Sequence, residues 1–88
     1  MWKMKNVYWV ESGDCWNNES KFFGTDRENA EKFARMMWGH YTEAEKKKGM
    51  FVHLCTAEVP SHLEDFDLIL EYCFEFIGGF NIEKEYMW

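Results

Sequence analysis

His53 and Cys55 come nearest to a chemical motif in this chain. They are two residues apart, so in a strand they share one face, where an imidazole and a thiol could ligate a metal or form a nucleophile pair. A zinc site needs three or four ligands, and no CxxC or HExxH pattern supplies the others. His40 and His62 fall near expected helix ends. The sequence therefore indicates no metal, no cofactor and no catalytic residue.

Acidic side chains form a second candidate site near the carboxyl end. Residues 50–88 carry eight acids and one base, a net charge of -7, whereas residues 1–24 are neutral and residues 25–49 have a net charge of +1. If residues 61–77 form a helix, four of these acids share a stripe about 80° wide: Glu64, Asp67, Glu71 and Glu75. Such a field repels nucleic acid and attracts basic surfaces, although acids also keep an aromatic-rich protein soluble.

Aromatic residues make up 19% of the chain, with eight Phe, five Trp and four Tyr. This is more than one small core can cover, and Trp and Tyr are enriched in interfaces. Trp16 lies in a turn-forming segment, residues 11–18, and either folds back as a lid on the core, which we favour, or projects as a binding residue. Tyr72 lies beside the acids. The candidate partner-binding residues are thus Glu64, Asp67, Glu71, Glu75, Trp16 and Tyr72.

The amino-terminal half predicts a hairpin followed by a helix. Residues 4–10 have large apolar side chains on both faces of a strand, and residues 20–24 form a second strand. Thr25 and Glu28 form a capping box, which begins an amphipathic helix. We expect this helix to end at Gly49 and to break near Gly39. Thr42 begins a second capping box. The apolar stripe of this helix consists of Ala30, Phe33, Ala34, Met37, Tyr41 and Ala44.

The carboxyl-terminal half has two interpretations. Residues 50–59 predict a third strand that Pro60 ends, and a capping box from Ser61 to Glu64 then opens a helix that Gly78 ends. Residues 67–76 also alternate like a strand, so the alternative is a hairpin through Gly78 and Gly79 into residues 80–88. We favour the helix, because a two-residue turn there would pair an apolar face with a polar one.

The expected fold class is α+β within one domain, residues 1–88. A three-stranded, mainly antiparallel sheet carries one amphipathic helix after the first hairpin, and a second, C-terminal helix covers its other face or forms an interface. A chain of 88 residues has room for one core. It has no apolar run near the ~20 residues of a membrane helix and no signal peptide. With an odd cysteine count, at Cys15, Cys55 and Cys73, we expect a cytoplasmic protein.

The order of these segments resembles that of small phage-encoded accessory proteins, the anti-CRISPR proteins among them. The resemblance covers roughly residues 4–59, in size, acidity and layout, and transfers no functional residue. It implies a protein that acts by binding a host defence enzyme. The segments that carry it are Lys21-Phe22-Phe23-Gly24-Thr25, Glu28-Asn29-Ala30-Glu31-Lys32-Phe33-Ala34, Phe51-Val52-His53-Leu54 and Ala57-Glu58-Val59.

Three functions are compatible with these patterns. The leading hypothesis is a non-catalytic inhibitor that binds a basic site on a larger protein and mimics nucleic acid. Its acids would lie where the phosphates would lie, with Trp or Tyr anchors beside them. It involves no direct contact with nucleic acid or membrane. The second is a homodimeric interaction protein that hides its apolar surplus. The third is a small metal- or thiol-dependent enzyme that uses His53 and Cys55.

Overall fold

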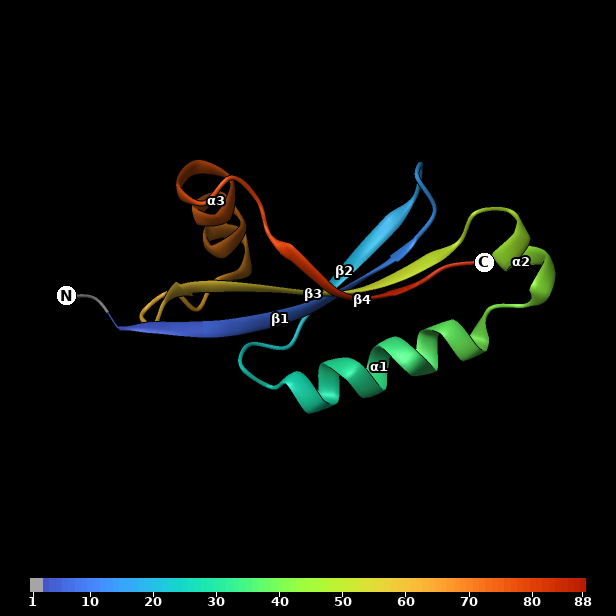
Figure 1. The fold of residues 1–88 in the computed structure, drawn as a ribbon, viewed down its shortest axis with the longest axis horizontal. Coiled ribbons are helices and arrows are strands. Elements are labelled where there is room, and N and C mark those ends of the chain that lie inside the picture. Colours follow the sequence, from blue (N-terminus) through green and yellow to red (C-terminus); the bar gives the residue numbers. More distant parts are fainter. Residues whose placement is uncertain (1–2) are drawn as a thin grey trace.

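The computed structural model describes residues 3–88, in which an antiparallel sheet carries helices on opposite faces (Figure 1). The four strands lie in the order β2-β1-β3-β4. No helix within the described residues has the length and apolar content that crossing a membrane requires. The elements are β1 (Met4–Gly13), β2 (Asn18–Phe22), α1 (Arg27–His40), α2 (Glu43–Lys47), β3 (Phe51–Pro60), α3 (Phe66–Phe76) and β4 (Asn81–Tyr86).

The long antiparallel pair of β1 and β3 forms the centre of the sheet, and it is buried on both faces. Its register runs from Met4 opposite Pro60 to Gly13 opposite Phe51. Successive side chains of a strand point to opposite faces, so Val7 and Trp9 pack under α3 whereas Val10 packs against α1. The prediction of a strand covered on both faces is confirmed, and the second predicted helix covers the face opposite the first.

Pro60 is the last residue of β3, so the strand ends at the proline as the sequence predicts. The backbone of Tyr8 exchanges hydrogen bonds with Phe23 and Gly24, on the side of β1 away from β3. Backbone groups of alternate residues point the same way, so Met4 also points away from β3. Pro60 lies opposite Met4, so an N–H at position 60 would point away from β1. A proline there therefore costs the β1–β3 ladder no hydrogen bond.

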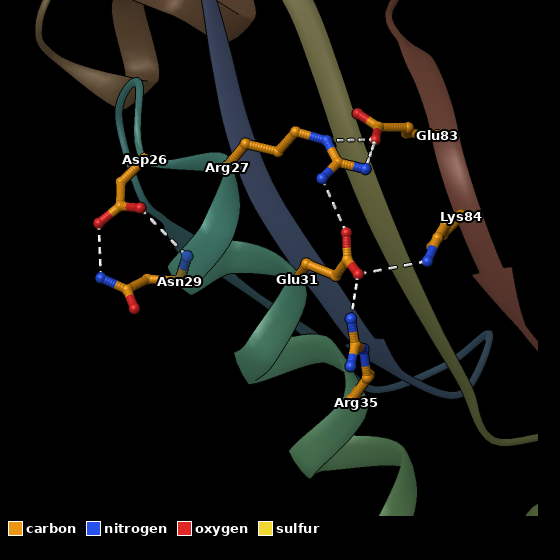
Figure 2. Close-up of polar contacts among 7 residues, drawn as sticks. All are labelled: Asp26, Arg27, Asn29, Glu31, Arg35, Glu83 and Lys84. Carbon is orange, nitrogen blue, oxygen red and sulfur yellow. Dashed lines mark hydrogen bonds and ion pairs between the residues drawn. The ribbon is translucent and has the colours of Figure 1, made fainter.

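The first helix begins one residue later than its capping box predicts. Asp26, not Thr25, is the N-cap, because its charged carboxylate accepts hydrogen bonds from both the backbone and the side-chain amide of Asn29 (Figure 2). The predicted break is confirmed, since α1 ends at His40 and the capping box of Thr42 and Glu45 opens the short α2. The buried stripe stops before Ala44, which is exposed.

Residues 66–76 are a helix, so the alternative of a C-terminal hairpin built from them is wrong. The helix does not begin at the capping box predicted from Ser61 and Glu64. The backbone N–H of Ser61 still donates to Lys3, which ties that residue to the end of β1. Asp65 is the N-cap instead, and its side chain accepts from the backbone of Asp67 and Leu68.

The sheet has a fourth strand, where the sequence predicts three. β4 pairs with β3, and all but one of its residues are exposed. Its sequence therefore lacks the alternation of apolar and polar residues that predicts a strand. The register between β3 and β4 shifts at a bulge: Leu54 pairs with Lys84, and Cys55 pairs with Ile82. Glu83, between these two residues of β4, has no partner on β3. Because a bulge changes the direction of neighbouring side chains, Glu83 and Lys84 both reach α1.

Ion pairs between α1 and β4 centre on Glu31 (Figure 2). Its carboxylate contacts Arg35, lies 2.8 Å from Arg27 Nη1 and 3.3 Å from Lys84 Nζ, and Arg27 also binds Glu83. The side chain of Glu31 is only 13% exposed. Hydrogen bonds, first from Arg35 and then from Lys84, lower the pKa of Glu31 to about 2. These pairs fix the most exposed strand to the helix beside it.

We predict that Glu31→Gln weakens the dependence of stability on acid pH. The pKa of Glu31 in the fold is below its ordinary 4.5, so its charged form stabilises the protein above that pH, and the contribution is lost as the pH falls through about 2. The free energy of unfolding, measured by denaturant titration between these pH values, should fall less steeply in the variant. Glu28→Gln, which removes an exposed pair with Lys32, is the control. Equal slopes for the two variants would contradict this role.

Gly13 allows the turn between β1 and β2 to close, and Gly13→Ala should destabilise the protein by at least about 2 kcal/mol. Its φ is +134°, and an added Cβ would lie 2.2 Å from the backbone oxygen of Asn17. Gly39→Ala is the matched control, since nothing lies within 4 Å of that Cβ and alanine favours a helix by roughly 0.5–1 kcal/mol. Thermal unfolding measures both, and a Gly13 variant as stable as the wild type would contradict the account.

Candidate partner-binding surface

Only a narrow stripe of α3 is buried against the sheet. Ile69 and Cys73, one turn apart, pack on the core of β1 and β3, and the ring of Phe66 lies 5.4 Å from that of Trp9. Phe66, Leu70 and Tyr72 are partly buried beside this stripe, whereas Leu68, Phe74 and Phe76 are exposed. Phe76 is 71% exposed and Phe74 is 62% exposed.

The four predicted acids are exposed around this helix. Glu64 lies in the turn before α3, whereas Asp67, Glu71 and Glu75 follow each other at intervals of one turn along it. None of the four carboxylates has a hydrogen-bond or ion-pair partner among residues 3–88. Three of the four acids thus form the predicted row along α3, whereas Glu64 lies before the helix begins.

A groove of about 470 Å³ lies beside this row, between α3 and the end of the β1–β3 pair. Glu71 and Glu75 lie on its wall, and Tyr72 stacks on Phe76 there with ring centroids 5.1 Å apart. The structure thus brings Tyr72 together with two of the predicted acids. The groove is lined by Met4, Pro60, His62, Leu63, Leu68, Glu71, Tyr72, Glu75 and Phe76.

Of the apolar half of this surface, only Tyr72 was predicted from the sequence. Leu68, Tyr72 and Phe76 each follow one of the acids by one residue, so they form a second row parallel to the first. That spacing is visible in the sequence and could have identified Leu68 and Phe76. Met4 and Pro60 could not have been found in this way, because only the strand register carries them to α3.

Trp16 is neither a lid on the core nor a neighbour of the acids. It is 88% exposed at the tip of the β1–β2 hairpin. That tip follows Gly13, at the end of β1 opposite to Met4 and the groove (Figure 1). Asp14 holds the turn, since its carboxylate accepts from the backbone N–H groups of Trp16 and Asn17, at 2.8 and 2.6 Å, and these bonds lower the pKa of Asp14. The turn is thereby fixed with its indole in solvent.

His53 and Cys55 do not form a reactive pair. Burial raises the pKa of the Cys55 thiol to about 12. The thiol donates a hydrogen bond to the backbone oxygen of His53, with a sulfur–oxygen distance of 3.8 Å. The imidazole ring is tilted against the ring of Phe51, with centroids 4.5 Å apart, and its Nε2 lies 3.8 Å from Glu85 Oε1, too far for a hydrogen bond. Within residues 3–88 no three His, Cys, Asp or Glu side chains are grouped to hold a metal ion.

Cys15 should react with thiol reagents far faster than Cys55 or Cys73. Cys15 is exposed, whereas the other two thiols are buried and burial raises the pKa of both, so they are protonated at neutral pH. Alkylation of the folded protein at pH 7.5, followed by peptide mass spectrometry, gives the three rates, and alkylation in denaturant is the control. Rapid modification of folded Cys55 would contradict the inert role and revive a thiol mechanism.

Comparisons of the chain with protein-family models, with curated proteins and with solved structures find no match.

Proposed function

We propose that this protein is a non-catalytic binding domain whose α3 surface occupies a basic site on a larger protein. The surface consists of the row Asp67, Glu71 and Glu75, with the apolar row and groove beside it. Unpaired acids supply electrostatic attraction, and exposed Leu68 and Phe76 supply apolar area to bury. The protein would be cytoplasmic, since its three cysteines are free thiols and thiols stay reduced in that compartment.

The contrast between the two helices carries this proposal. On α1 the acids are neutralised, Glu31 by Arg27, Arg35 and Lys84, and Glu28 by Lys32. On α3 there is no base at all, and the acids have no partner in the described part of the chain. Solubility alone needs no such segregation, and it does not account for large apolar side chains in the row next to the charges.

A protein that binds nucleic acid is the partner class that we favour. Such proteins hold phosphates in positively charged channels, which is the kind of surface an acidic row complements. The resemblance to anti-CRISPR proteins suggests the same class, with inhibition by occlusion as the outcome. Trp16 is a separate contact point in this proposal, because it lies at the far end of the sheet from the acids.

Self-association through this same surface is the less favourable alternative. A symmetric pairing of two α3 helices along the groove would bring Glu71 and Glu75 of both copies together, and like charges repel. A homodimer that uses α3 would instead bury its other flank, where Phe74 and Ile77 are exposed. The proposed partner is therefore a different protein.

Reversing the acidic row together with Glu64 should weaken partner capture by about tenfold or more. The variant carries Glu64→Lys, Asp67→Lys, Glu71→Lys and Glu75→Lys, and the matched control reverses four exposed acids elsewhere, at Glu19, Glu28, Glu43 and Glu58. Both proteins change net charge equally, so local and global effects separate. Affinity capture from lysate of the native cells, at 0.1 M and 1 M salt, measures the effect.

The control should retain the partner at low salt, and wild-type capture should fall as salt rises. Circular dichroism checks that both variants fold. Equal capture by the wild type and the α3 variant, or equal loss in both variants, would contradict the proposed surface.

A further inference from the structure

We propose that the segment that enters the groove is a basic amphipathic α-helix of the partner. This inference rests on the proposed function and specifies the shape of the ligand. It follows from three features of the surface: the backbone beside the groove, the spacing of its two rows and the sign of its charge.

The groove favours a ligand whose own backbone is already satisfied. One wall is α3, whose N–H and C=O groups bond within the helix, and the other is the end of the β1–β3 pair, where Pro60 has no N–H to offer. An extended peptide lying along α3 would find no backbone partner on that wall, and backbone groups left unpaired against apolar side chains are costly. A helix enters with those groups paired and presents only side chains.

The spacing of the rows matches a second helix. Asp67, Glu71 and Glu75 are about 6 Å apart along the axis, as are Leu68, Tyr72 and Phe76 in the apolar row. Side chains four residues apart form the ridges by which helices pack into each other's grooves. A partner helix with Lys or Arg at i, i+4 and i+8, each next to a large apolar residue, would meet both rows at once.

The charge of the surface selects among helices. Nucleic acid and acidic helices, including a second copy of α3, would place like charges against Glu71 and Glu75. A basic helix pairs with these carboxylates without having to displace an existing ion pair, because none is formed within residues 3–88. Helix-in-groove recognition by spaced apolar anchors is a common mode of peptide binding.

Three synthetic peptides test this inference by fluorescence anisotropy. The first has Lys at i, i+4 and i+8 with a Leu beside each, in a sequence of high helix propensity. The second has a central Pro in place of one Ala, and the third has Glu in place of each Lys. The first should bind the wild-type protein, and the second should bind on the order of 100-fold more weakly, because proline interrupts the bound helix.

A charge exchange locates the binding. The variant Glu71→Lys, Glu75→Lys should lose the Lys peptide and gain the Glu peptide, whereas Glu28→Lys, Glu43→Lys should bind like the wild type. Equal binding of the Pro peptide, or no binding of the Lys peptide, would overturn the helical ligand. If acid-dependent capture from lysate persisted in that case, the proposed function would stand without it. Equal binding to both protein variants would overturn the groove as the site.

Discussion

The ten-residue pairing of β1 with β3 is the constraint on which the rest of the structure depends. Because both strands are buried on both faces, each face needs a cover, and one helix supplies it on each side. The helices lie over different parts of the pair, α3 toward Pro60 and α1 toward Val52 (Figure 1). The end of the pair that carries Met4 and Pro60 becomes one wall of the groove.

The surface of α3 follows from this division. A ribbon of two strands fully buries only Ile69 and Cys73 of the helix, and Leu68, Phe74 and Phe76 lie exposed outside the core. On α1 the amphipathic pattern matches the area available, and its outer face is charged and paired. The two helices thus differ in that α3 keeps an exposed apolar and acidic surface, which we propose that a partner covers.

Much of the architecture is predictable from the sequence, because its signals are local. The apolar strand over residues 4–10, the break before Thr42 and the helix before Gly78 are all present in the structure. The pairing of β4 was not predictable: the alternative that made residues 80–88 a strand paired them with residues 67–76, whereas β4 pairs with β3 and is held by ion pairs of Glu83 and Lys84 with residues over 50 positions away. The acids of α3 were found by periodicity, whereas the groove depends on a strand register that no local pattern encodes.

Site-specific photo-crosslinking tests most directly whether α3 is the binding surface. A photoreactive phenylalanine analogue would replace Phe76 on α3 or Met36 on α1, two exposed apolar positions on opposite faces of the sheet. The account predicts that the Phe76 probe crosslinks one protein in the native cell, that reversal of Glu71 and Glu75 abolishes the product, and that the Met36 probe does not give it. The same product from Met36 alone, or one from Phe76 that is indifferent to the acids, would contradict the central claim.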